Sequence, residues 1–145
     1  MTTAMKPSKR SATSWDVDFK PRVADLKEYL IRLTGMSKAG NRDVFMLCLG
    51  VGFKMQKTRP RPPKNSDAVI LKYFTDADRA IMRSVALSHT KDHSVLLDED
   101  KIYDIAEEFA AGGLEVLVTE MSNQEDFVDY LTKLFYVNLK SVGAN

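Results

Sequence analysis

The segment VFMLCLGVGFKM, residues 44–55, constrains the fold of this chain more than any other part of its sequence. It is apolar almost all round a helix, so other elements must enclose it on several sides. Asn41 is positioned to cap its start. Gly50 and Gly52 would let a neighbouring backbone approach closely at a modest cost in helix propensity. The segment therefore predicts a central buried helix.

Two further helices are predicted on either side of this one, because apolar residues recur there at three- and four-residue steps. The first begins near Pro21, which suits a first helical turn, and runs to Thr34 with Gly35 as its stop. The second is capped by Thr75 or Asp76 and runs to about Ser88.

The C-terminal part of the chain predicts more helix. Asp98-Glu99-Asp100 places three acids in a first turn, where they complement the helix dipole. Gly112-Gly113 interrupts the apolar stripe that follows, so either one kinked long helix or two helices meeting there would fit. Asn123 and Glu125-Asp126 open a last helix with its apolar face on Phe127 and Leu134.

The segment 68–74, AVILKYF, reads either as a strand or as one or two helical turns. A strand needs a partner, and no second strand stands out in the sequence. We therefore expect a mainly α fold, a compact bundle of about five or six helices with at most one short strand or hairpin around 68–74.

Composition and charge suggest how the 145 residues are organised. Residues 1–18 are rich in Ser, Thr and Lys, which predicts a flexible basic N-terminal arm. Residues 19–140 would form a single helical domain with a basic, proline-rich loop over 54–66, and 141–145 a C-terminal tail. The net charge of +1 is a cancellation: residues 1–64 hold 14 Lys+Arg against 5 Asp+Glu, and the remainder 7 against 15.

This charge asymmetry has two interpretations. The basic half could contact nucleic acid while the acidic half meets a protein partner, or the two halves could simply attract each other when folded. Opposite charge on two faces also allows homo-oligomers. In the first interpretation, mobile cations of the arm and loop would neutralise phosphates without reading sequence. The candidates for DNA contact are Lys6, Lys9, Arg10, Lys54, Lys57, Arg59, Arg61 and Lys64.

Large apolar residues near the two ends of the chain are candidates for contact with a protein partner. Trp15 and Phe19 could dock the end of the arm onto the domain or onto a partner. Phe135 and Tyr136, at the end of the last predicted helix, complete this set.

The sequence offers no recognisable catalytic, cofactor or metal site, so we expect a protein that is not an enzyme. Cys48 lies in the apolar segment, where a thiolate is disfavoured. His89 and His93 could share a helix face, but a zinc site usually needs four ligands. The acids around Asp98–Glu108 fit the solvent side of a helix. No apolar run is long enough to span a bilayer and no secretory leader is evident, so we expect a cytoplasmic protein without a membrane segment.

Two phrases in the sequence are similar to motifs of a known family. Residues 42–53 read RDVFMLCLGVGF, and residues 105–117 read IAEEFAAGGLEVL. Over about residues 22–135 the chain resembles the small Dnd-system-associated proteins, which are encoded beside bacterial genes for DNA phosphorothioation. That family has an Asp-Val-Phe start to an apolar helix, a basic loop and a later Gly-Gly-Leu-Glu motif. Phe109 stands here where the family has tyrosine.

The resemblance implies an accessory role in bacterial anti-phage defence, beside a larger operon-encoded protein of the ATPase or nuclease class. It carries over no catalytic residue. We therefore expect a non-catalytic subunit that binds such a partner and contacts DNA through its basic arm and loop. The alternative is a stand-alone transcriptional regulator in which 22–34 and 41–55 form a helix-turn-helix-like pair.

Overall fold

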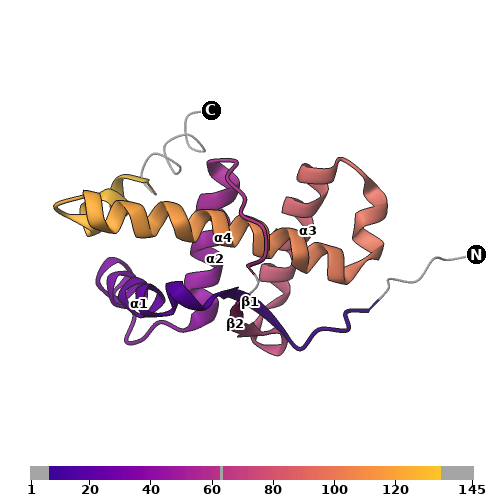
Figure 1. The fold of residues 1–145 in the computed structure, drawn as a ribbon, viewed down its shortest axis with the longest axis horizontal. Helices are drawn as coiled ribbons and strands as arrows, with labels where there is room; N and C mark the ends of the chain where they lie inside the picture. The colour runs from indigo at the N-terminus through magenta and orange to yellow at the C-terminus, as the bar shows by residue number, and fades with distance from the viewer. Residues whose placement is uncertain (1–6, 63, 135–145) are drawn as a thin grey trace, which may run out of the picture.

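The computed structural model describes residues 7–62 and 64–134 of the chain. Its fold is mainly α with one short two-stranded sheet, as the sequence predicts. Two helices cross near the middle: α2 (Asn41–Lys54) and the longer α4 (Glu99–Asn123). In Figure 1, α4 runs the length of the molecule, with α1 (Lys20–Thr34) near one end and α3 (Asp76–Thr90) near the other. Short 3₁₀ turns link these elements: η1 (Val17–Phe19), η2 (Leu71–Tyr73) and η3 (His93–Leu97).

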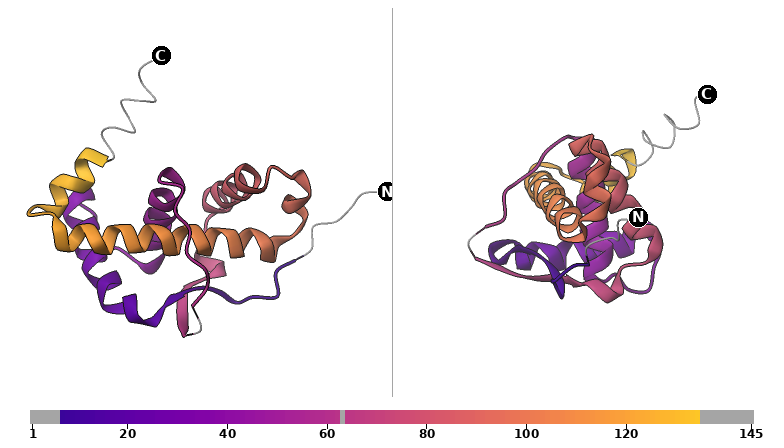
Figure 2. Two further views of the ribbon diagram at one scale, coloured as in Figure 1. Left: turned by 45° about the horizontal axis from the view of Figure 1, so that its top comes forward. Right: turned by 90° about the vertical axis from the view of Figure 1, so that its right-hand side faces the viewer.

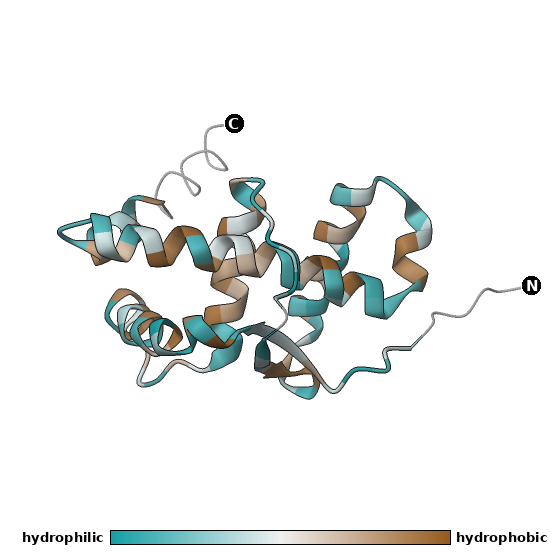
Figure 3. Cartoon of the chain, viewed as in Figure 1, coloured by the Kyte–Doolittle hydropathy of each residue, from teal (hydrophilic) through white to brown (hydrophobic). Residues whose placement is uncertain are grey.

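The prediction of a central buried helix is confirmed for α2. Seven of its residues are buried, and its ribbon is mostly pale or brown where α4 crosses it (Figure 3). The start of the helix differs from the prediction. Asn41 lies inside the first turn and its side-chain amide donates to the Ala68 carbonyl at 2.8 Å. The Asp43 carboxylate takes over the capping role and accepts the Gly40 N–H at 2.9 Å.

Glycines set the distance between α2 and α4. A Cβ on Gly113 would overlap the main-chain carbonyl of Cys48, and one on Gly52 would overlap that of Phe109. Only glycine lets the two backbones approach this closely. Gly50, by contrast, faces open space, so the predicted close approach holds for Gly52 and is wrong for Gly50. The glycine pair Gly112-Gly113 does not divide α4, because both residues have ordinary helical conformations at the crossing.

The remaining helices begin and end close to the predicted residues. Gly35 ends α1 in the left-handed conformation, with φ 73°. Thr75 caps α3, and Asp78 completes the capping box by accepting the Thr75 N–H at 2.9 Å. Asp78 also accepts from Arg42 (Nη2 to Oδ1, 2.9 Å), which ties the start of α3 to the start of α2. Burial opposes the charge on Asp78, but the hydrogen bonds from Arg42 and Thr75 outweigh it and lower its pKa.

The last predicted helix is present from residue 127 to the end of the described part at 134, with Phe127 and Leu131 buried. The ring of Phe127 packs edge-on against that of Tyr29, with centroids 4.8 Å apart. This contact joins the C-terminal helical segment to α1. The two segments therefore share the core at one end of the molecule.

The second strand comes from the segment in which the sequence predicts a flexible arm. Strand β1 (Ala12–Asp16) pairs antiparallel with β2 (Asn65–Ile70), with Trp15 opposite Ser66. Thr13 and Trp15 are buried, with exposed fractions of 0% and 5%. A two-stranded ribbon is unstable alone, and here it packs on the helices. The structure thus departs from the predicted arm over residues 12–16, because tertiary contacts order a segment that is too polar to fold by itself.

Candidate functional site

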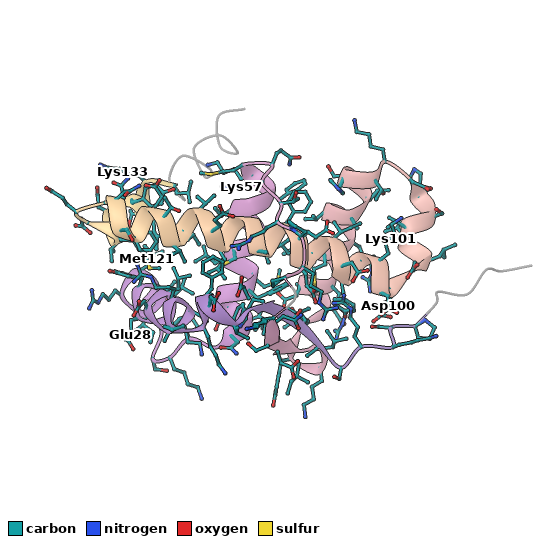
Figure 4. The ribbon with its side chains drawn as sticks, viewed as in Figure 1. Glu28, Lys57, Asp100, Lys101, Met121 and Lys133 are labelled. Carbon is teal, nitrogen blue, oxygen red and sulfur yellow. The ribbon has the colours of Figure 1, made fainter. Side chains whose placement is uncertain are left out.

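The basic loop that follows α2 crosses over α4 at its glycines. The Lys57 N–H donates to the Gly52 carbonyl at 2.8 Å, and the Arg59 N–H donates to the Glu108 carbonyl at 3.0 Å. A Cβ on Gly112 would overlap the Lys57 carbonyl, so this glycine makes room for the loop. Figure 4 shows Lys57 at the point where the chain leaves α2. The loop is therefore held by main-chain bonds against the middle of α4.

The cations of this loop face carboxylates of α4 and β1. Lys57 Nζ lies 3.5 Å from a Glu115 carboxylate oxygen, and Arg59 Nη2 lies 3.6 Å from one of Asp16. The Arg59 guanidinium also stacks over the Phe19 ring, 4.9 Å from its centroid. Arg61 Nε is 3.9 Å from Glu107 Oε2. At these nitrogen-to-oxygen distances each ion pair is weak by itself.

The N-terminal segment contacts the same face of this helix, and its Arg10 shares Glu107 with Arg61 of the loop. Arg10 forms ion pairs with both Asp104 and Glu107, and its side chain is only 15% exposed. Nearer the start of α4, the Ser8 hydroxyl donates to Asp100 at 2.6 Å and the Lys9 N–H donates to it at 3.2 Å. Figure 4 shows Asp100 beside this part of the chain. The N-terminal segment thus lies along the acidic face of α4.

Glu107 is the point at which strand, loop and helix meet. It is 6% exposed and accepts the Ser14 N–H at 3.0 Å in addition to its pair with Arg10. Burial raises the pKa of Glu107 above its usual range, even though Arg10 and Arg61 pull in the opposite direction. Desolvation of the carboxylate therefore costs more than its ion pairs return.

The eight candidate DNA-contact residues differ in whether they form ion pairs within the protein. Arg10, Lys57, Arg59 and Arg61 are used in internal ion pairs. Lys9, Lys54 and Lys64 form no ion pair with any other described residue. Lys6 lies outside the described residues. Part of the charge asymmetry therefore reflects ion pairs between the basic and the acidic half of the folded chain. This agrees with the interpretation in which the two halves attract each other.

The four candidate partner-contact residues are placed differently again. Trp15 is 5% exposed, and its indole Nε1 is buried without a hydrogen-bond partner among the described residues. Phe19 packs against the core and under Arg59. Phe135 and Tyr136 lie outside the described residues. The two placed side chains therefore belong to the folded domain, where they hold the N-terminal segment and the loop.

The structure shows an exposed apolar surface that sequence reasoning missed. Ile70 and Tyr73 are 46% and 59% exposed, at the end of β2 and in η2. They border a groove of about 520 Å³ between β2 and the start of α2, lined by Lys38, Gly40, Asn41, Arg42, Ala68, Val69, Ile70 and Tyr73. Lys72 Nζ lies 5.4 Å from the centroid of the Tyr73 ring. The sequence does not indicate this surface, because the apolar residues of 68–74 that become buried cannot be distinguished by type from those that stay exposed, and packing alone decides which of them face solvent.

The α2 helix does not offer a face for reading a base edge. Residues on all its sides are buried, and α4 crosses it along Cys48 and Gly52. A recognition helix must expose a polar face to the major groove. The arrangement therefore argues against the helix-turn-helix alternative.

Other classes of site find little support in the described residues. Ranges 7–62 and 64–134 hold no cluster of three or more His, Cys, Asp or Glu side chains arranged to bind a metal ion. Burial strongly raises the pKa of the Cys48 thiol, so its reactive thiolate is disfavoured. Within the same ranges, no helix has both the length and the apolar character that crossing a membrane requires.

Comparison with known proteins gave one match. Residues 21–141 match the family model described as DNA sulphur modification system-associated protein 4. The match takes in α1, α2, the basic loop, α3 and α4, and so includes the glycine crossing. Neither the curated proteins nor the solved structures gave a match. Since this family model matches most of the chain, the protein belongs to the family of DNA sulphur modification system-associated protein 4.

Proposed function

We propose that this protein is a non-catalytic accessory subunit of a DNA sulphur modification system and binds a larger protein of that system. The exposed groove beside Ile70 and Tyr73 carries the proposal. A tyrosine that is 59% exposed next to an exposed isoleucine is typical of an anchor for a protein partner. Lys38 at the rim favours a partner segment that combines apolar and acidic side chains, whereas the charge of Arg42 is already paired with Asp78. Such a partner would be of the ATPase or nuclease class, and the complex would act in anti-phage defence.

Co-purification with defined proteins of the system tests this proposal. The tagged wild-type chain should retain one larger system protein, identified by mass spectrometry. The double variant Ile70→Asp with Tyr73→Asp should reduce the retained amount at least about tenfold. Loss of anchor residues typically removes about 2 kcal/mol or more of binding free energy, and about 2 kcal/mol corresponds to a roughly thirtyfold weaker dissociation constant. Leu97→Asp alters an exposed apolar residue elsewhere and should leave binding unchanged. Equal retention by all three chains would contradict the proposed surface.

The proposal includes sequence-independent contact with DNA through those candidate cations that form no ion pair with another described residue. Lys9 belongs to the N-terminal segment, and Lys54 and Lys64 lie at the two ends of the basic loop. Arg10, Lys57, Arg59 and Arg61 would have to leave their carboxylates first, which lowers what they could contribute. The proposal therefore assigns the first contact to the three lysines.

Binding to duplex DNA at several salt concentrations tests the DNA contact. Affinity should fall as salt rises, equally for unrelated sequences. Replacing Lys9, Lys54 and Lys64 together by alanine should weaken binding and reduce the slope of log K against log salt by roughly 2 to 3, since each phosphate contact contributes about 0.9. A control that replaces Lys20, Lys27 and Lys101 should keep most of the slope. An unaltered slope in the first variant, or no binding at low salt, would refute the DNA contact.

A further inference from the structure

The side chains of the basic loop are held far less firmly than its main chain. The N–H groups of Lys57 and Arg59 fix the backbone to α2 and α4 through two hydrogen bonds. The cationic side chains of Lys57, Arg59 and Arg61 form only long ion pairs, of 3.5 Å or more, and are 34–52% exposed. Exposed pairs of this length contribute little to stability. These cations can therefore exchange one anion for another while the backbone of the loop stays in place.

Glu115 is the one carboxylate that faces two of these cations. Its Oε1 lies 3.5 Å from Lys57 Nζ, and its Oε2 lies 3.9 Å from Arg59 Nη1. Its side chain is 40% exposed, whereas that of Glu107 is 6% exposed and bonded to strand β1. An anion with two oxygens directed at two cations makes the same kind of contact as a phosphate group. Glu115 thus fills an anion position at the surface without being part of the core.

The cations of the loop are spaced as a row. Lys57, Arg59 and Arg61 are alternate residues, and Pro60 and Pro62 favour an extended conformation in the residue before each. Alternate residues of an extended chain point to the same side, about 6.5 Å apart. Figure 2 shows the loop between α2 and β2 crossing α4 on the outside of the molecule. A row of cations on an exposed, extended segment suits the successive phosphates of a nucleic acid strand.

We propose that Lys57 and Arg59, with Arg61 next in the row, form a second phosphate-binding site for DNA, and that Glu115 blocks this site by standing in for a phosphate. The inference rests on the proposed DNA contact and adds its regulation. DNA held by the three lysines reaches the loop cations only by displacing Glu115. Arg10 does not take part, because its side chain is 15% exposed and paired with two carboxylates of α4.

Binding of duplex DNA to Glu115→Gln tests the blockade. Glutamine keeps the size of the side chain and removes its charge. The variant should bind DNA roughly threefold to tenfold more tightly at low salt, because two competing ion pairs of the strength typical for exposed groups are lost. The slope of log K against log salt should steepen by roughly 1 to 2, since each freed cation adds a phosphate contact that contributes about 0.9.

Glu28→Gln is the matched control for net charge. Glu28 is an exposed residue of α1, and Figure 4 shows it well away from Lys57. Its replacement makes the same change in net charge but frees no cation of the loop. It should change the affinity for DNA by less than about twofold, because salt screens a distant charge.

Removal of the two cations shows whether the gain passes through them. Lys57→Gln with Arg59→Gln keeps most of each apolar stem and removes both charges. This pair of changes should weaken DNA binding by a larger factor when Glu115 is glutamine than when it is glutamate, and it should abolish the gain. Thermal unfolding of Glu115→Gln should stay close to that of the wild type, because the lost pairs are weak.

The possible outcomes separate this inference from the DNA contact on which it rests. If Glu28→Gln matches Glu115→Gln, or if the gain persists without the two cations, the blockade by Glu115 is refuted and binding through the three lysines stands. If neither the wild type nor any variant binds DNA at low salt, both proposals fail.

Discussion

Gly113→Ala is expected to destabilise the protein by roughly 3 kcal/mol or more, enough to remove much of the stability of a small domain. The new methyl group would overlap the Cys48 carbonyl, and this obstacle is main chain within α2, which cannot change rotamer to avoid it. The helices would have to separate along their most extensive contact. Gly52→Ala should act in the same way through the Phe109 carbonyl. Chemical denaturation monitored by circular dichroism measures both effects.

Gly50→Ala is the matched control for this experiment. Gly50 is two residues from Gly52 in the same helix, is exposed, and has no atom near the position of a Cβ. Alanine there should stabilise the protein by about 0.5–1 kcal/mol through helix propensity alone. If Gly113→Ala were as stable as Gly50→Ala, the close crossing of α2 and α4 would be wrong.

Glu107→Ala is expected to cost roughly 3 kcal/mol at neutral pH. It leaves the Arg10 guanidinium without its buried partner and the Ser14 N–H without an acceptor. Loss of these contacts should release β1 first, so amide exchange at residues 12–16 should rise more than exchange in α2. Asp104→Ala removes the other carboxylate paired with Arg10, but that group is 56% exposed and its loss should cost less than about 1 kcal/mol. Equal effects of the two changes would contradict the central role of Glu107.

The dependence on pH follows from the raised pKa of Glu107. The pKa of Glu107 in the folded protein lies above the ordinary value of 4.5, which it has in the unfolded chain. At a pH between 4.5 and the folded-state pKa, the folded state therefore binds more protons than the unfolded state. Its contribution to stability is therefore full below pH 4.5 and declines as pH rises through the folded pKa. Glu107→Gln keeps an acceptor for Ser14 and removes the titration. Its stability relative to wild type should improve between pH 4 and pH 7, and a change in the opposite direction would mean that the ion pairs outweigh burial.

Local patterns were sufficient to predict most of the helical segments. Thr75 and Gly35 bound helices where their residue types indicate, since a side-chain cap and a left-handed C-terminal residue are local requirements. The apolar segment around Cys48 could only be buried. Strand β1 was not predictable in this way. Its five residues form a strand only because β2 and α4 accept their hydrogen bonds and bury Trp15.

The candidate site residues also divide into features that the sequence predicts and features that depend on tertiary contacts. The basic residues were identified from composition, but whether a cation meets solvent or a carboxylate depends on which helix the loop crosses. Ile70 and Ile81 could not be distinguished from core residues, because exposure of one apolar residue among several is decided by packing. The sequence by itself determined the helices, the buried centre and the family. Tertiary structure alone decided the strand pairing, the ion pairs on α4 and the exposed apolar faces, because these depend on contacts between residues far apart in the chain.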